Sequence, residues 1–199
     1  MPAHHHRHQH GVMSGWIVRP YDLVVGGVLM RGTYRRIAEH LTTGIVSGGR
    51  VLDIGTGPGR LVEAISRRRD DLQVIGIDPS SDMITRARRR TRTLPNVQVR
   101  MASAEDLPFE EESVDAVVSS LSSHHWADRV VALDEQARVL RPGGRLWLVD
   151  LASHLPDGIR DEVHDAGLRI TDVEADKEIL GAAHRRLVLI TARKPLAAA

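Results

Sequence analysis

The stretch VLDIGTGPGR, from Val51 to Arg60, decides the fold of this 199-residue chain. Hydrophobic residues enter it, glycines follow at alternate positions (Gly55, Gly57 and Gly59), and LVEAIS leaves it with helical spacing. The pattern predicts a strand, a tight turn and the start of a helix. Glycines there allow a positive φ and let a ligand approach the backbone more closely than a Cβ would permit. We expect a small molecule at this turn.

The composition is that of a globular protein. The chain is 42% hydrophobic and 27% charged, and its formal net charge is +1, so no overall field would attract nucleic acid or an anionic membrane. The absence of cysteine excludes disulfides, thiolate metal sites and cysteine nucleophiles, and indicates a cytoplasmic location. The apolar run 23–30 is shorter than the roughly 20 residues of a membrane span, so we expect none.

The N-terminus differs from the rest of the chain. Residues 1–15 include MPAHHHRHQH and are expected to form a disordered His-rich tail, whereas residues 16–199 are expected to form a single domain. The tail histidines can bind divalent cations adventitiously, but they have no fixed ligand geometry. We therefore expect no resident metal.

Strand-like and helical segments alternate after the glycine turn. Strands are expected at 51–55, 73–78, 95–103, 114–121 and 145–150, with helices at 82–92 and 129–140 and a Pro-Gly turn at 141–144. A helix at 33–46 precedes them, and a short helix at 156–167 and strands at 168–176 and 184–194 follow them. The pattern predicts an α/β fold: a Rossmann-like doubly wound sheet, mostly parallel, with a C-terminal antiparallel strand pair.

The turn suits two classes of ligand. In open α/β sheets, ligands bind at the carboxyl ends of the strands, where the strand order reverses. A dinucleotide fingerprint has the spacing G-x-G-x-x-G, but here the third glycine comes one position early and Arg60 takes its place. Asp78 ends the second strand, where a carboxylate can accept hydrogen bonds from ribose hydroxyls. Dinucleotides and adenosyl ligands both carry a ribose, so Asp78 does not separate them.

Five short segments follow one another along the chain in this order: VLDIGTGPG (51–59), VIGIDPS (74–80), ASAEDLPF (102–109), VDAVVSSLSSHHWAD (114–128) and VLRPGGRLWLVD (139–150). Together they resemble class I S-adenosylmethionine-dependent methyltransferases, and the resemblance covers residues 21–194. The AEDLPF and HHWAD variants are similar to those of small-molecule, quinone and lipid methyltransferases. The resemblance implies S-adenosylmethionine as the cofactor and S-adenosylhomocysteine as its product.

The resemblance also implies where the cofactor binds. Asp53 would lie near the methionine amino group, Asp78 would hold the ribose, and Ser119 would offer a backbone oxygen to the ammonium. The family often has aspartate where this chain has Ser103, and a neutral hydroxyl binds the adenine amino group less strongly than a carboxylate. The remaining cofactor-binding residues are Tyr21, Gly55, Thr56, Gly57, Gly59, Pro79, Met83, Ala104 and Glu105.

The candidate catalytic residues are His124 and His125, which follow the fourth expected strand. Methyl transfer is an in-line displacement at a carbon activated by positive sulfur, so the protein mainly aligns the nucleophile and excludes water. A histidine can move the acceptor's proton near neutral pH. Alternatively, the pair caps or orients the next helix together with Trp126 and Asp128.

The sequence does not identify the methyl acceptor or the segment that covers the binding cleft. We expect a small-molecule or lipid-like acceptor. Asp150 and His154, just past the fifth strand, could touch it, but a solvated loop is the favoured interpretation of His154. Nucleic acid is not expected, because the arginine runs 67–69 and 86–92 lack interleaved aromatics. Only residues 151–167 separate the fifth and sixth strands. Either the N-terminal segment 16–31 or a second subunit of a homodimer would therefore cover the cleft, or the substrate is bulky.

Three functions follow from these observations. The first is methyl transfer. The second is a non-catalytic sensor or partner subunit that binds S-adenosylmethionine or S-adenosylhomocysteine, suggested by Ser103 and the short connection after the fifth strand. The third is a nicotinamide oxidoreductase, which the early third glycine and the absence of a Tyr-x-x-x-Lys pair oppose.

Overall fold

The structure is a computed structural model, and it describes residues 28–175 and 187–197. The predicted tail at 1–15, Tyr21 and most of the predicted cover at 16–31 lie outside the described residues. The last residues of that cover, 28–31, belong to a helix.

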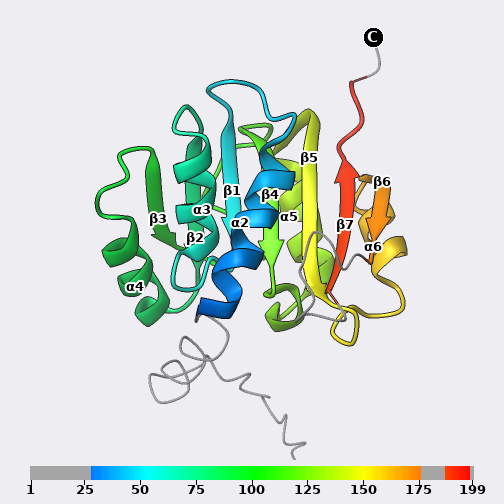
Figure 1. Cartoon of the computed structure of the whole chain (residues 1–199). Helices are drawn as coiled ribbons and strands as arrows, with labels where there is room; N and C mark the ends of the chain where they lie inside the picture. Colours follow the sequence, from blue (N-terminus) through cyan, green and yellow to red (C-terminus); the bar gives the residue numbers. More distant parts are fainter. Residues whose placement is uncertain (1–27, 176–186, 198–199) are drawn as a thin grey trace, which may run out of the picture.

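Within the described residues, seven strands form one mixed sheet in the order β3-β2-β1-β4-β5-β7-β6 (Figure 1). The first five run parallel, and β7 pairs antiparallel with both β5 and β6. The predicted α/β, doubly wound sheet with its C-terminal antiparallel pair is confirmed. The strands are β1 (Arg50–Ile54), β2 (Gln73–Asp78), β3 (Val97–Met101), β4 (Val114–Ser120), β5 (Leu140–Leu151), β6 (Arg169–Glu174) and β7 (Leu187–Arg193).

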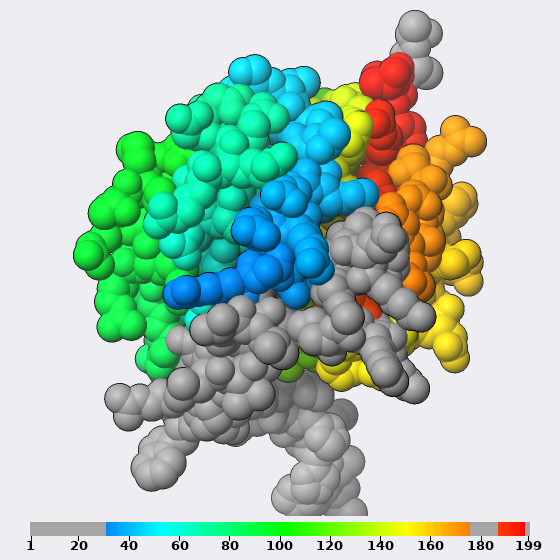
Figure 2. All heavy atoms as spheres, in the orientation of Figure 1, coloured from blue at the N-terminus to red at the C-terminus, as the bar shows by residue number. Residues whose placement is uncertain are grey.

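Helices cover both faces of the sheet (Figure 1). One face carries α2 (Val28–Thr42), α3 (Arg60–Arg68) and α4 (Ser81–Thr91), which adjoin one another in the space-filling view (Figure 2). The other carries α5 (Arg129–Val139) and α6 (Ile159–Asp165), and the short 3-10 helix η1 (Ser123–His125) follows β4. The helices begin and end where the sequence provides caps: Ser80 and Asp128 accept backbone N–H bonds at the starts of α4 and α5, and Gly167 follows α6 with a φ of 78°.

Two apolar layers hold these helices against the sheet. Leu41 of α2 and Ile65 of α3 pack with Trp147 of β5 on one face. Leu133 of α5 and Val163 of α6 pack with strand residues on the other. Because both faces are buried, the central strands consist almost entirely of apolar residues at their cores. The polar residues lie toward the two ends of these strands, and the carboxyl ends are at the lower edge of the sheet in Figure 1.

The predicted turn at residues 141–144 is wrong. These residues belong to β5, and the pairing of β4 with β5 shifts register between Val114 and Ala116. Gly143 adopts a φ of 78° and its N–H donates to the Lys194 carbonyl oxygen at 2.9 Å. The Pro-Gly pair therefore makes a bulge inside a long strand, because the end of the chain supplies it with a partner.

Candidate cofactor and catalytic site

The glycine turn lies at the point where the strand order reverses, between β1 and its neighbours β2 and β4. Gly55, Gly57 and Gly59 all have left-handed φ values, of 69°, 53° and 78°. A Cβ on Gly55 would lie 2.4 Å from the Ser122 Cβ, and one on Gly59 would lie 2.9 Å from the Ala87 Cβ. At Gly57, nothing described lies within 4 Å of that position. The first and third glycines thus allow close packing, whereas the second borders open space.

Asp78 fixes the shape of this turn. Its Oδ2 accepts a hydrogen bond from the Gly57 N–H at 2.9 Å, and its Oδ1 accepts one from the Ser80 N–H at 2.9 Å. Burial raises the pKa of Asp78, and the two backbone N–H groups oppose that rise. The sequence assigned Asp78 only to a ribose, but the carboxylate also joins the turn to the start of α4. Each oxygen keeps a lone pair for a ligand.

Asp53 lies beneath the turn with only 1% of its surface exposed. Among the described residues, its Oδ2 has no hydrogen-bond partner, and neither has the Thr56 hydroxyl. Burial raises the pKa of Asp53 to about 7, although the neighbouring Thr56 side chain opposes the rise, and the charge of Asp78 adds to it. A buried carboxyl oxygen without a partner is unusual, and it fits a ligand that brings its own positive charge.

Ser119 ends β4 beside this turn. Its hydroxyl lies 2.6 Å from that of Ser122, which in turn donates to the Ile54 carbonyl oxygen at 2.8 Å. These bonds tie the end of β4 to the end of β1. The side chain of Ser119 is therefore committed to the protein, and the role of its backbone oxygen in binding a ligand stays a prediction.

The remaining predicted cofactor residues surround the ends of β2 and β3. Pro79 is exposed, Met83 and Ala104 are buried, and Ser103 pairs with Asp106 in an isolated β-bridge. Nothing described places a ligand against them, so their predicted roles stay predictions.

Glu105 has a structural contact that the sequence did not indicate. Its Oε1 accepts hydrogen bonds from the N–H groups of Ala127 at 2.7 Å and Asp128 at 3.3 Å. The Asp128 side chain in turn caps α5 by accepting the Val131 N–H at 3.2 Å. Glu105 and Asp128 thus fix the loop that carries the two candidate catalytic histidines, and neither histidine is the cap of α5.

His124 is held by Asp150, which ends β5 and is fully buried. The His124 Nδ1 lies 3.1 Å from Asp150 Oδ1 and 3.0 Å from Oδ2. The same carboxylate accepts the Ser123 hydroxyl at 2.6 Å and the Leu151 N–H at 2.8 Å. Burial alone would raise the pKa of Asp150, but the hydrogen bonds from His124 and Ser123 outweigh it and lower the pKa.

Two further imidazoles adjoin His124. The rings of His125 and His154 lie 4.0 and 4.2 Å from the His124 ring, centroid to centroid. Burial lowers the pKa of His125, and the neighbouring His124 lowers it further. His125 therefore stays neutral at pH 7 and can accept a proton. The structure brings together both predicted catalytic histidines and the two residues, Asp150 and His154, that the sequence connected only with substrate contact.

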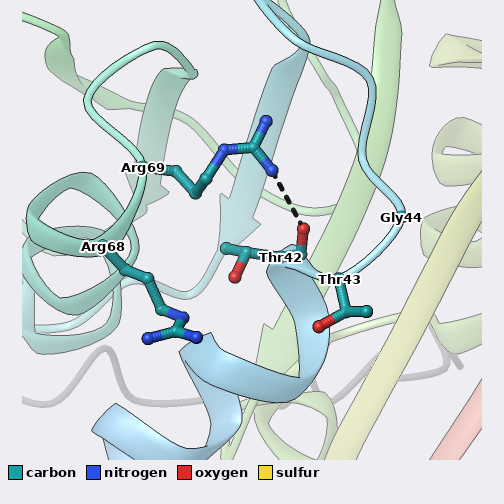
Figure 3. A pocket seen from close by; sticks show the side chains of 5 residues that line it. All are labelled: Thr42, Thr43, Gly44, Arg68 and Arg69. Atoms are coloured by element: carbon teal, nitrogen blue, oxygen red, sulfur yellow. Dashed lines mark hydrogen bonds between the residues drawn. The ribbon is translucent and has the colours of Figure 1, made fainter.

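A separate hollow of about 400 Å³ lies at the opposite edge of the sheet, lined by Thr42, Thr43, Gly44, Arg68 and Arg69 (Figure 3). The Arg69 guanidinium donates to the Thr42 carbonyl oxygen at 3.2 Å and binds Asp71 at 2.7 Å. These bonds anchor the end of α2 to the loop after α3. The hollow is remote from the carboxyl ends of the strands, so we assign it a structural role.

Comparison with known proteins shows which family of proteins the chain is similar to. Residues 52–148 match the family model described as a methyltransferase domain. The chain is 42% identical over 100 residues to an uncharacterized methyltransferase of Mycobacterium tuberculosis, covering 50% of this chain and 39% of the relative. It is 32% identical over 157 residues to a ubiquinone/menaquinone biosynthesis C-methyltransferase of Vibrio campbellii, covering 75% of this chain and 60% of the relative.

These curated relatives are longer than the matched region, since the chain spans about two fifths of the first and three fifths of the second. The fold is similar to that of a SAM-dependent methyltransferase from Aquifex aeolicus, with a TM-score of 0.76 and 19% identity over 92% of this chain and all of the other. No helix in the described part of the chain is long and apolar enough to cross a membrane.

Proposed function

Since this chain belongs to the class I S-adenosylmethionine-dependent methyltransferases, we propose that it transfers the methyl group of S-adenosylmethionine to a small-molecule or lipid-like acceptor. The observation that carries the proposal is the buried Asp53 oxygen without a partner, next to the open position at Gly57. The cofactor carries an ammonium and a sulfonium. A carboxyl group that has no positively charged partner in the protein would attract both of these positive charges. The N-terminus of α3 would stabilise the negative charge of the cofactor carboxylate.

The binding residues divide by the part of the cofactor they would hold. Asp53 and the Ser119 carbonyl oxygen would bind the ammonium, and Asp78 would accept the ribose hydroxyls with its remaining lone pairs. Ser103 would accept the adenine amino group. The turn residues Gly55, Thr56, Gly57 and Gly59 would line the methionine portion, and Pro79, Met83, Ala104 and Glu105 would border the adenosine.

The chemistry needs alignment more than it needs a strong base. The cofactor supplies an activated methyl group, and in-line attack requires the acceptor atom to lie opposite the sulfur. Burial lowers the pKa of His125, so this ring would be neutral near pH 7 and would take the acceptor's proton, while Asp150 holds the neighbouring His124 in place. Released S-adenosylhomocysteine would be the second product.

The acceptor class rests on the connection after β5 and on the relatives. The segment from β5 to β6 contains one short helix, α6, so it adds no large cap over the carboxyl edge of the sheet. An edge that this segment leaves uncapped would accommodate an elongated or lipid-like molecule. The relative named for quinone biosynthesis, at 32% identity, supports the same class.

Calorimetric titration with S-adenosylhomocysteine tests the binding step. We expect saturable binding, and we expect Asp78→Ala to weaken it at least about tenfold because two backbone N–H groups and the ribose lose their acceptor. Asp134→Ala, on the exposed side of α5, is the matched control and should bind normally. Absence of heat from the folded wild-type protein would reject the proposal.

Transfer of a labelled methyl group tests the acceptor. The protein is incubated with labelled S-adenosylmethionine and separate polar and lipid fractions of a cell extract. Label in a small or lipid-like product, lost in Gly57→Ala, supports the proposal. Tight binding without any transfer would instead identify a non-catalytic sensor or partner subunit.

A further inference from the structure

Three side chains converge just beyond the carboxyl ends of β4 and β5. His124 comes from η1, Asp150 ends β5, and His154 lies in the turn that follows. That turn is closed by the His154 N–H, which donates to the Leu151 carbonyl oxygen at 2.8 Å. The chain after β5 therefore folds back, and it brings the His154 ring over the same carboxylate that His124 contacts.

The distances between the ligand atoms match those around a metal ion. His124 Nδ1 lies 3.1 Å from Asp150 Oδ1, His154 Nδ1 lies 3.6 Å from the same oxygen, and all three residues offer ligand atoms within 4.8 Å of one another. Zinc binds nitrogen and oxygen at roughly 2.0–2.2 Å, so neighbouring ligands of a tetrahedral site lie about 3.3 Å apart. The two separations from Asp150 lie on either side of that value, and the full set of ligand atoms, within 4.8 Å of one another, would close around an ion by small rotations of the exposed rings.

Hydrogen bonding alone accounts for only part of this cluster. The bond between His124 and Asp150 has normal length, but 3.6 Å between His154 and Asp150 is too long for a hydrogen bond. Yet two imidazole nitrogens point at one buried carboxylate. A cation between the three groups would account for the approach of both rings to this carboxylate, beyond their contact with each other.

The surrounding residues hold the Asp150 carboxylate in place and leave the imidazole rings of His124 and His154 accessible to solvent. Asp150 has no exposed surface and is fixed by the Ser123 hydroxyl and the Leu151 N–H, as supporting residues fix metal ligands elsewhere. The His124 and His154 side chains are 22% and 40% exposed, so an ion can enter from solvent.

We propose that His124, Asp150 and His154 form a binding site for a divalent metal ion of the zinc type. Two nitrogens and one oxygen leave a coordination position open, as in sites that bind water or a substrate oxygen. The existence of this site does not depend on the proposed function. Its use does: at the carboxyl edge of β4 and β5, the open position would receive an oxygen of the methyl acceptor and polarise it.

The test uses Co²⁺, whose visible absorption reports coordination. All proteins carry the full chain with the tail histidines replaced by glutamine (His4, His5, His6, His8 and His10), because these would bind metal themselves. We expect one Co²⁺ per chain, with the absorption of a four-coordinate ion. His154→Ala and His124→Ala should each weaken binding by at least about tenfold. The matched control His164→Ala, whose side chain is 84% exposed, should bind as the parent does.

Two results would overturn the proposal. One is no saturable Co²⁺ binding by the tail-substituted parent, shown by its thermal melt to be folded. The other is unchanged affinity in both His124→Ala and His154→Ala, which would move the ion elsewhere. Titration of S-adenosylhomocysteine into the same parent without metal reports the proposed function separately, so failure of one does not imply failure of the other.

Discussion

Replacing Asp53 by asparagine should make the protein more stable at neutral pH and less able to bind its cofactor. Asp53 is 1% exposed, and its pKa is raised from 3.8 to about 7 because burial disfavours the charged form. In the unfolded chain the same carboxyl group ionises at its ordinary pKa. Asparagine has nearly the same shape but never ionises, so it removes this difference between the two states.

The size of the effect follows from the two pKa values. Below pH 3.8 the group is neutral in both states and costs nothing. Between the two pKa values, each pH unit lowers the free energy of unfolding by about 1.4 kcal/mol, because only the unfolded state releases its proton. The total loss is about 4 kcal/mol, and it stays constant above pH 7. Over pH 5 to 7, the advantage of Asp53→Asn should therefore grow by about 2 kcal/mol, since Asp53 is already half ionised in the folded protein at pH 7.

Urea unfolding of the cofactor-free protein at pH 5, 6, 7 and 8 measures this advantage. The difference between variant and wild type should rise up to pH 7 and then level off, whatever constant offset the buried amide adds. Asp134→Asn, at an exposed site, should give a flat difference. Parallel pH profiles for Asp53→Asn and wild type would refute the reasoning, since they would mean that Asp53 ionises normally in the folded protein.

Three further predictions concern the cofactor. If only ionised Asp53 binds the ammonium, the affinity for S-adenosylhomocysteine should rise about tenfold from pH 6 to pH 8 in calorimetry, and a flat profile would contradict this. Gly57→Ala should cost about 1 kcal/mol of stability at its φ of 53° and also impair binding, whereas Gly48→Ala, at a φ of 72° and equally open, should cost as much without impairing it. Ser103→Asp should tighten binding severalfold, because a carboxylate accepts the adenine amino group more strongly than a hydroxyl, and an unchanged dissociation constant would place the adenine elsewhere.

Local patterns in the sequence were enough to predict the fold. The alternation of short apolar strands and helical segments predicted a parallel sheet, and the short sequence between the last two expected strands predicted their antiparallel pairing. The glycine turn and Asp78 were found for the same reason, since a turn between a strand and a helix depends on residues close in sequence. Family resemblance added roles for these residues, which geometry alone would have left open.

The errors and omissions depend on contacts between distant parts of the chain. Gly143 was assigned to a turn because its partner, the Lys194 carbonyl oxygen, comes from the far end of the chain. The hydrogen bonds that Glu105 accepts from the Ala127 and Asp128 N–H groups cross a loop and were not predicted, whereas its role at the cofactor stays a prediction. The approach of His154 to Asp150 also depends on a loop conformation that no periodicity encodes.

Asp53 and Asp150 show how one residue type serves two purposes at the same edge of one sheet. Both end buried parallel strands, but Asp53 has an oxygen without a partner and a raised pKa, whereas Asp150 accepts bonds from His124, Ser123 and Leu151 and has a lowered one. Environments that shift the pKa values of two carboxyl groups in opposite directions indicate different chemical roles. The first carboxyl group lacks a positive partner and so suits a cationic ligand. The second is already charged and holds imidazoles in place, so it suits the acceptor side of the reaction.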